Sequence, residues 1–529
     1  MECDLIGCDV EEIFILKKLL PFLPLILLLF VTGCTLPANS NREESYAYQD
    51  TGATRIGKSL QLSRSQGIHG DGFVLLDSGL DAFVARATLA DMADRSIDVQ
   101  YYLYHDDLVG KLFTAVLLKA ADRGVRVRVL IDDMDMSDRD DDIIAFDHHP
   151  NIQVRIFNPF NRDISRNSQF VTGFGSVTRR MHNKSFTVDN VASILGGRNI
   201  GNEYFAANSS VEFADLDVLA VGAVVKDVSR AFDLYWNNEL AYPAKTIIRA
   251  RPTEEAMQAS LEKILGFLEE EKTSEYITAL KDSDLAKSIR RGRVDYYIGN
   301  ATVLVDHPDK IASDRDASEL QLRTQLKPYF DELEQELIIV SPYFVPGKEG
   351  VEFLKELVDR GVKVVILTNS LASNDVAAVH AGYKKYRKDL LRAGVELYEM
   401  NKKLTRAQRK QRKRESGSSK ASLHAKTFVL DRSRVFIGSL NLDPRSFYEN
   451  SEIGLILESP EVAGYMATTL SDEFQRDAFR LELRDDGKKI LWHGFENGTP
   501  VTFDSDPYAS LWRRFSVSFL SFLPIESQL

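Results

Sequence analysis

The fold is decided by His182-Asn183-Lys184-Ser185-Phe186-Thr187-Val188-Asp189, because its pattern recurs at His424-Ala425-Lys426-Thr427-Phe428-Val429-Leu430-Asp431. Small residues and an asparagine follow each copy, in Gly196-Gly197-Arg198-Asn199 and Gly438-Ser439-Leu440-Asn441. The step from histidine to asparagine is 17 residues both times, 199 − 182 and 441 − 424. The chain therefore carries two copies of a His/Lys/Asn cluster.

A second landmark repeats at almost the same interval. Predicted helices end at Arg123-Gly124 and at Arg360-Gly361, and each is followed by an alternating or apolar strand. The offset is 237 residues for this landmark (361 − 124) and 242 for the histidines (424 − 182). Two landmarks at nearly one offset indicate a duplicated domain. We predict an α/β fold of two related lobes, each a mixed β-sheet flanked by helices, with a pseudo-twofold active site between them.

Composition limits the class of protein. The chain has 529 residues, 44% hydrophobic and 27% charged, which is typical of a globular protein with room for two or three domains. Its net charge of −12 argues against general affinity for nucleic acid. No nucleic-acid partner is expected.

The first residues are typical of an export signal. Two lysines precede the apolar run 19–31, which is short for a membrane span. The run ends in Val31-Thr32-Gly33-Cys34, which resembles a bacterial lipoprotein cleavage site and makes Cys34 the expected lipidation site. An uncleaved hydrophobic anchor is the alternative. Both place the protein in a bacterial cell envelope, anchored to a membrane and facing the periplasm.

Five segments are expected from these boundaries. They are a signal peptide of the lipoprotein type (1–33), a polar tether (34–69), a first lobe (70–250), a helical linker (251–292) and a second lobe (293–529). The polar tether is predicted because this stretch lacks hydrophobic periodicity.

The repeated clusters fit attack on a phosphodiester. Alternate residues of a strand share a face, so His182 lies beside Lys184, and His424 beside Lys426. A neutral imidazole can attack phosphorus while a second, protonated imidazole donates to the departing oxygen. Lysines and asparagines, here Asn199 and Asn441, can stabilise charge on the phosphate oxygens. This chemistry requires no cofactor, and we assign no metal site.

Carboxylates are needed to orient histidines that exchange protons. Alignment of the strand after each motif pairs Asp215 with Glu452, and we predict that these two carboxylates lie behind the histidines and orient them. The motif acids Asp189 and Asp431 belong to the catalytic motif by pattern. Their position at a turn favours a role in holding that turn.

These residues resemble the two HKD motifs of the phospholipase D superfamily, over roughly residues 70 to 529. The flanks, including Arg180-Met181-His182 and Val379-His380-Ala381-Gly382-Tyr383, are similar to those of bacterial cardiolipin synthases. The resemblance implies a phospholipase D-type phosphatidyltransferase that uses phospholipids at a membrane, with phosphatidylglycerol as acceptor and phosphatidylethanolamine as donor. It makes His182 the nucleophile and His424 the acid/base. The alternatives are a hydrolytic phospholipase D, an envelope phosphodiesterase or nuclease, and a non-catalytic lipid-binding lipoprotein.

Three further features are open to two interpretations. His380 and Tyr383 share a helical face and could line a headgroup pocket. The basic run 402–414 could attract anionic lipid, or be a solvated loop. The aromatic residues of 512–522 form an amphipathic helix that either leans on a membrane or packs on its own core.

Overall fold

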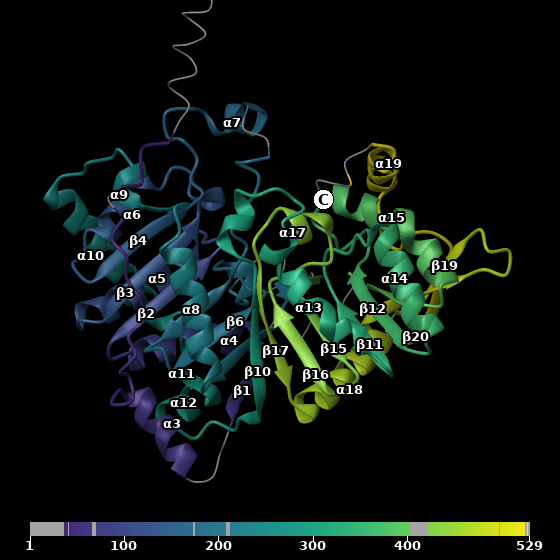
Figure 1. Cartoon of the computed structure of the whole chain (residues 1–529), viewed down its shortest axis with the longest axis horizontal. Coiled ribbons are helices and arrows are strands. Elements are labelled where there is room, and N and C mark those ends of the chain that lie inside the picture. The colour runs from purple at the N-terminus through teal and green to yellow at the C-terminus, as the bar shows by residue number, and fades with distance from the viewer. Residues whose placement is uncertain are drawn as a thin grey trace, which may run out of the picture.

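The computed structural model describes residues 36–40, 42–65, 70–172, 175–207, 212–402, 421–496, 498–523 and 526. The predicted signal peptide, Cys34 and the basic residues 403–414 lie outside these ranges. Two α/β lobes stand side by side, the first in purple to blue and the second in green to yellow (Figure 1). No described helix has the length and apolar character needed to cross a bilayer.

The first lobe is a mixed sheet. Its central strands β2, β3 and β4 are parallel, as expected of strand-helix-strand units, and the remaining pairings are antiparallel. Across the sheet the strands are β9 (Ala241–Pro243), β4 (Ile152–Phe157), β3 (Arg126–Asp132), β2 (Ser96–Tyr101), β5 (Ser185–Val188), β6 (Ala192–Gly196), β8 (Asp217–Val221) and β1 (Asp71–Leu76).

The second lobe repeats this order. Its parallel trio is β11, β12 and β13, and the other neighbours are antiparallel. In the matching order the strands are β18 (Ala478–Leu483), β13 (Glu396–Met400), β12 (Lys363–Asn369), β11 (Glu336–Val340), β15 (Thr427–Leu430), β16 (Arg434–Gly438), β17 (Ile453–Glu458) and β10 (Tyr297–Val305), with β19 (Ile490–Glu496) and β20 (Thr499–Phe503) added beyond β18.

The two sheets are joined into one. Strand β1 pairs antiparallel with β10, where Gly72 lies opposite Ile298, so the described residues form a continuous 18-stranded sheet. The duplicated α/β fold predicted from the sequence is confirmed, and the β1–β10 ladder fixes how the lobes face each other.

Helices cover both faces. The outer helices include α4 (Gly79–Met92), α5 (Leu108–Asp122), α6 (Asp140–Asp147), α13 (Leu322–Asp331), α14 (Gly347–Asp359) and α15 (Ala377–Arg392). Helices α8 (Val224–Trp236) and α18 (Pro460–Asp477) share one apolar core with strands of both lobes. Burial of apolar surface in this common core stabilises the lobes against each other.

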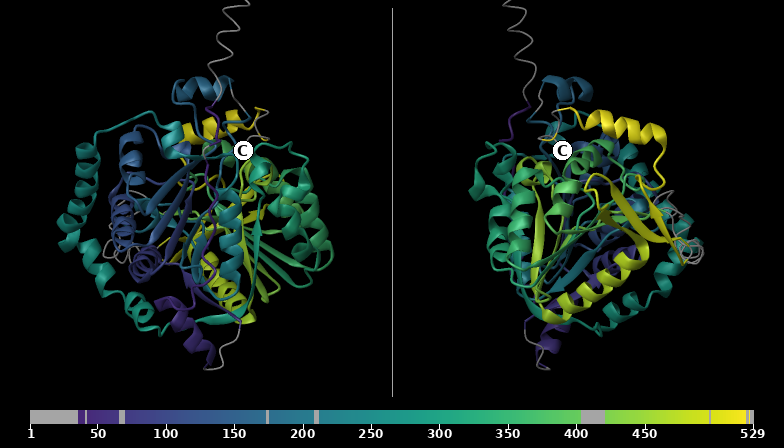
Figure 2. Two further views of the ribbon diagram at one scale, coloured as in Figure 1. Left: turned by 60° about the vertical axis from the view of Figure 1, so that its left-hand side comes forward. Right: turned by 90° about the vertical axis from the view of Figure 1, so that its right-hand side faces the viewer.

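The segment predicted as a helical linker carries three helices. These are α10 (Glu254–Glu270), α11 (Glu275–Asp282) and α12 (Asp284–Arg291). They run along the outside of the first lobe, as the left view of Figure 2 shows in teal.

The predicted polar tether 34–69 is wrong in part. Residues Arg55–Ser65 form helix α3, and residues 43–47 lie against the first lobe. The buried guanidinium of Arg128 donates to the carbonyl of Ser45 at 2.8 Å, and Asp233 accepts from the amide of Ala47 at 2.9 Å. Buried charges of the lobe thus hold a polar segment that hydrophobic periodicity could not detect.

Candidate active site

The two motif histidines lie at the seam between the lobes. The amide of His182 donates to the carbonyl of Ser451 at 2.9 Å, and the amide of His424 donates to the carbonyl of Ala214 at 2.8 Å. Ala214 ends strand β7 (Glu212–Ala214), which pairs in parallel with β14 (Ala421–Leu423) of the other lobe. The backbone of each lobe therefore positions the histidine of the other.

The orienting carboxylates are exchanged in the same way. Nδ1 of His182 lies 2.8 Å from Oε2 of Glu452, and Nδ1 of His424 lies 2.6 Å from Oδ2 of Asp215. These are the two acids that the strand alignment selected. Each carboxylate fixes the orientation of its ring, so that Nε2 faces away from the acid, and Nε2 of His424 lies 3.4 Å from Nζ of Lys426. The sequence did not indicate that each acid would serve the opposite lobe.

The lysines share the site with their histidines. Nζ of Lys184 donates to the carbonyl of His182 at 2.6 Å, and Nζ of Lys426 contacts the carbonyl and the ring of His424. Both lysines are buried, and burial is the main reason that their pKa values are lowered, that of Lys184 to about 7. A bound phosphate would supply the negative charge that favours both ammonium groups.

The two histidine–carboxylate pairs differ electrostatically. Burial lowers the pKa of His182, and Lys184 and Lys426 lower it further. Burial and Lys426 also lower the pKa of His424, but here the Asp215 carboxylate opposes them. Burial raises the pKa of Glu452 to about 7. Burial acts in the same sense on Asp215, yet His424 and Lys426 outweigh it and hold that pKa well below its ordinary value.

The two predicted phosphate-binding asparagines are both buried but differ in their partners. Asn199 accepts from the amide of Leu103 at 3.2 Å and donates to the hydroxyl of Tyr204 at 3.0 Å. Oδ1 of Asn441 has no hydrogen-bond partner among the described residues. The amide of Asn199 is therefore engaged within its own lobe, whereas the carbonyl oxygen of the Asn441 amide has no such partner among the described residues.

Asp189 and Asp431 do not lie among the reacting groups. Each opens a turn at the far end of the strand that follows the lysine, with positive φ values of 53° and 50°. The Asp189 carboxylate accepts the amides of residues 94, 95 and 96, and Asp431 accepts those of 334, 335 and 336. Both acids fix the turn that leads into the first parallel strand of their lobe, β2 or β11.

Several groups at the site carry no motif of their own. Tyr102 packs edge-on to His182, with ring centroids 5.0 Å apart, and Tyr204 and Phe213 lie 5.1 and 5.0 Å from the His424 ring. Ser439 donates to Glu452 at 2.5 Å. Only Ser439 could have been found from the sequence, since it replaces a glycine of the first motif.

His380 and Tyr383 do not line a headgroup pocket. Both are buried in the second lobe, where Arg387 lies 2.6 Å from His380 and pairs with Asp506 at 2.8 Å. Tyr383 donates to Glu399 at 3.1 Å. Their shared helical face contacts a buried charge network instead of the active site.

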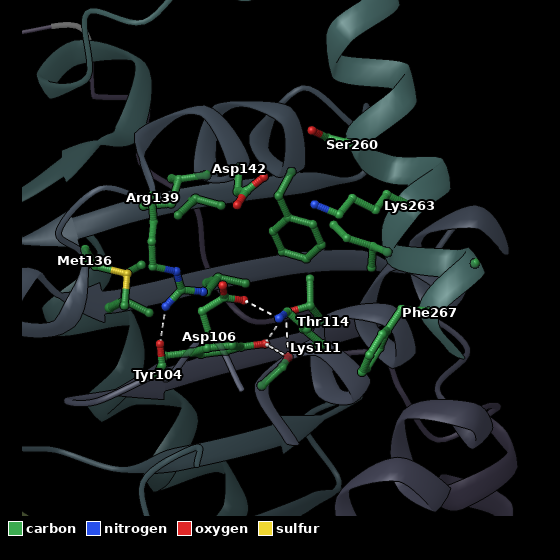
Figure 3. Close-up of a pocket in the computed structure, with 18 of the residues that line it drawn as sticks. Tyr104, Asp106, Lys111, Thr114, Met136, Arg139, Asp142, Ser260, Lys263 and Phe267 are labelled. Carbon is green, nitrogen blue, oxygen red and sulfur yellow. Dashed lines mark hydrogen bonds and ion pairs between the residues drawn. The ribbon is translucent and has the colours of Figure 1, made fainter. Parts of the chain in front are cut away.

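A cavity of about 410 Å³ lies elsewhere, between α5, α6 and the linker helix α10 (Figure 3). Its walls are mainly apolar, and charged side chains such as Lys111, Arg139 and Lys263 surround them. None of the motif residues lines it, so the chemistry described above belongs to the seam and not to this cavity.

Comparison with known proteins adds the family. The family model described as "Cardiolipin synthase, PLD-like domain" matches residues 87–236 and 326–477, one copy in each lobe. The chain belongs to this family. It is accordingly an enzyme of the phosphatidyltransferase type, as the motifs predicted.

Two cardiolipin synthases illustrate the range of similarity within this family. Cardiolipin synthase C of Escherichia coli (strain K12) is 40% identical over 455 residues, which cover 86% of this chain and 95% of that protein. A cardiolipin synthase of Oceanobacillus iheyensis is 25% identical, covering 79% of this chain and 71% of that protein. The crystal structure of phosphatidylserine synthase from Haemophilus influenzae Rd KW20 has a TM-score of 0.53 at 15% identity, covers 80% of this chain and 92% of that one, and shares the fold.

Proposed function

We propose that this protein makes cardiolipin by transferring a phosphatidyl group from phosphatidylethanolamine to phosphatidylglycerol through a covalent phospho-histidine. The observation that carries the proposal is the pair of buried histidines at the seam, each fixed through Nδ1 by a carboxylate of the opposite lobe. Similarity to cardiolipin synthase C of E. coli supports the choice of product.

The first step forms the intermediate. Nε2 of neutral His182 attacks the phosphorus of phosphatidylethanolamine and forms the N–P bond as the bond from phosphorus to the ethanolamine oxygen breaks. Protonated His424 donates its Nε2 proton to the departing alkoxide, so ethanolamine leaves as the neutral alcohol. Lys184 and Lys426 stabilise charge on the non-bridging oxygens.

The second step reverses the proton transfer. A terminal hydroxyl of phosphatidylglycerol gives its proton to His424 and attacks phosphorus, and the N–P bond breaks to release cardiolipin and free His182. Water in place of phosphatidylglycerol would give phosphatidic acid. The acceptor, not the motif chemistry, therefore separates a synthase from a hydrolytic phospholipase D.

Electrostatics support His182 as the nucleophile. Its neutral form is favoured by burial and by two neighbouring ammonium groups, and the principal influences on its pKa all act in that direction. Burial and Lys426 lower the pKa of His424 too, but the anionic Asp215 opposes them, so the protonated form that a general acid requires is less disfavoured at His424 than at His182. The assignment by family resemblance and the charge distribution agree.

We further propose that the enzyme is held at the membrane of a bacterial cell envelope, on the periplasmic side, through Cys34 or through the apolar run 19–31. The support is the sequence of this segment, which resembles a lipoprotein signal. Cell fractionation together with the mass of the mature N-terminus tests this placement. A cytosolic, unprocessed chain would contradict it.

The test of the reaction is a labelled-lipid assay. The full chain is incubated with phosphatidylethanolamine carrying labelled acyl chains and with unlabelled phosphatidylglycerol. We expect labelled cardiolipin together with free ethanolamine. Labelled phosphatidic acid without labelled cardiolipin would show that the protein is a hydrolase and not a synthase. Undiminished turnover by the His182→Ala variant would contradict the covalent mechanism.

A further inference from the structure

The C-terminal helix α19 (Leu511–Leu520) exposes its aromatic face instead of burying it. Trp512, Phe515 and Phe519 are 75%, 62% and 59% exposed, and Leu511 and Phe522 are also exposed. Single exposed apolar residues are ordinary on a protein surface, but a contiguous set on one helix indicates an interaction surface. We call Trp512, Phe515 and Phe519 the α19 aromatic face.

The opposite side of α19 fixes the helix to the second lobe. Val517 is buried in a small core with Leu371 and Ala381. Lys384 donates to the hydroxyl of Ser518 at 3.1 Å. Residues 512, 515 and 519 lie on one side of a helix, and residue 517 lies on the other. The attachment to α15 therefore determines that the aromatic face points to solvent.

Helix α19 lies beside the active site. Arg513 donates to the carbonyl of Asn374, and the next residue, Asp375, accepts from the hydroxyl of Tyr343 at 2.8 Å. In the same loop the carbonyl of Ser373 accepts from the hydroxyl of Ser422 at 2.9 Å, two residues before His424, so the loop borders the segment that carries the catalytic histidine. Figure 1 shows α19 at the same end of the molecule as α17 (Pro444–Tyr448), which follows Asn441.

The start of the described chain lies at this end as well. Asn39 donates to the carbonyls of Glu239 and Ala241, just before helix α9 (Ala244–Ile247), which is labelled near the top of Figure 1. The 35 residues that precede the described chain include the apolar run 19–31. The described chain thus begins at the same end of the molecule as α19 (Figure 1).

We propose that α19 is an interfacial helix that docks this end of the molecule on a phospholipid surface. Trp and Phe side chains on one face of a short helix are suited to the boundary between headgroups and acyl chains. Lipid substrates must reach histidines that are buried at the seam, and docking through α19 brings the bilayer close to the loop that borders the His424 segment. The inference rests on the proposed function only in taking phospholipids as substrates.

Tryptophan fluorescence tests the proposal on the full chain. The protein has three tryptophans, and Trp236 and Trp492 are buried whereas Trp512 is exposed. The protein is bound to vesicles of phosphatidylglycerol and phosphatidylethanolamine with brominated acyl chains. We expect the bromine to quench the Trp512 emission, and the Trp512→Phe variant to lose the quenched component.

A matched reporter controls for general proximity to lipid. Tyr465 is 50% exposed on α18, at the opposite end of the molecule in Figure 1. The double variant Trp512→Phe/Tyr465→Trp carries an exposed tryptophan there, and its emission should be quenched by aqueous iodide and not by bromolipid. Access of iodide but not bromolipid to Trp512 would overturn the proposal. So would protection of Trp512 from both quenchers, since a protein partner or a second copy would then cover the helix.

A kinetic test separates docking from chemistry. The triple variant Trp512→Ser/Phe515→Ser/Phe519→Ser should transfer phosphatidyl groups about tenfold more slowly on vesicles and at the unchanged rate with short-chain lipids below their micelle concentration. Equal rates on vesicles would overturn the inference. If bromolipid quenches Trp512 but the unmodified protein has no transferase activity, the proposed function is wrong and the docking proposal still holds.

Discussion

The His182 and His424 centres are copies of one motif, yet their surroundings make them different groups. His182 is bound to Glu452, whose buried carboxyl also accepts from Ser439 and has a pKa raised to about 7. His424 is bound to Asp215, whose pKa is held well below its ordinary value. The comparison teaches that a duplicated site can give its two histidines different proton affinities by changing the residues behind them.

Removal of either histidine should have the largest effect and should separate the two roles. We expect His182→Ala and His424→Ala each to lower kcat on the order of 10⁴-fold, because the two groups act as one unit. With a donor whose leaving group needs no proton, such as a nitrophenyl ester of phosphatidic acid, His424→Ala should still form a phospho-enzyme in an acid-quench experiment. If a phospho-enzyme forms in His182→Ala but not in His424→Ala, His424 is the nucleophile and His182 the general acid.

The orienting acids should rank next. Asp215→Asn should lower kcat by about 10³-fold, because the general acid loses the anion that favours its protonated form. Glu452→Gln should cost less, about 10²-fold, since a neutral partner still binds the His182 ring. Steady-state kinetics on the labelled lipids measure both. An equal decrease of kcat in the two variants would mean that Asp215 and Glu452 contribute equally to the reaction.

Exchanging the small residues beside each acid sharpens the comparison. A Cβ at Gly197 would lie 2.1 Å from Oδ1 of Asp215, so Gly197→Ser must displace this carboxylate and should cost about 10²-fold in kcat. Ser439→Gly removes one hydrogen bond to Glu452 and should cost about tenfold. An unchanged kcat in the Gly197→Ser variant would show that the exact position of the Asp215 carboxylate is not critical.

Glu452 and Asp215 should also change the pH dependence of the free energy of unfolding in opposite directions. The pKa of Glu452 rises from 4.5 to about 7 on folding, so the folded protein binds more protons in this window and loses stability as pH increases through it. Glu452→Gln should therefore gain about 3 kcal/mol of stability relative to the unmodified protein between pH 4 and pH 8.

Asp215 should behave in the opposite sense, because its lowered pKa stabilises the folded protein above pH 3.8 and this contribution is lost as pH falls. Asp215→Asn should thus be destabilising at pH 8. Urea unfolding of both variants across the pH range measures the two trends. A stability difference that stays constant with pH in either variant would contradict the assignment.

The smallest effects concern the motif acids at the turns. Asp189→Asn replaces a carboxylate that accepts three backbone amides and should lower the free energy of unfolding by about 2 kcal/mol. Asp431→Asn should cost a similar or smaller amount, since Asp431 is less buried. Thermal unfolding measures the loss. A kcat that falls while Tm is unchanged would place these acids in the chemistry after all.

Much of the fold could be predicted because duplication makes local patterns visible twice. The strands after His182 and His424, the helix ends at Gly124 and Gly361, and the acids Asp215 and Glu452 all follow from aligning one half of the chain with the other. Each of these features is determined within a short segment of the chain and can therefore be predicted from a single sequence.

Contacts between the lobes could not be predicted in this way. The exchange of Asp215 and Glu452 depends on the β1–β10 ladder and on the shared core of α8 and α18, and neither leaves a local pattern. The predicted tether 34–69 was wrong in part for the same reason, since buried Arg128 holds Ser45 from a distant strand. Such contacts join segments that are distant in the chain, and hydrophobic periodicity within one segment does not report them.

The exchange of carboxylates also bears on how the chain is made. Synthesis proceeds from the N-terminus, so the ribosome completes His182 and Asp215 long before it adds Glu452. Until His424 and Glu452 have been added, His182 lacks both the second histidine of the site and its own carboxylate partner. The site at the seam is therefore completed only in the last part of translation, and a chain that ends before residue 424 lacks half of its reacting groups.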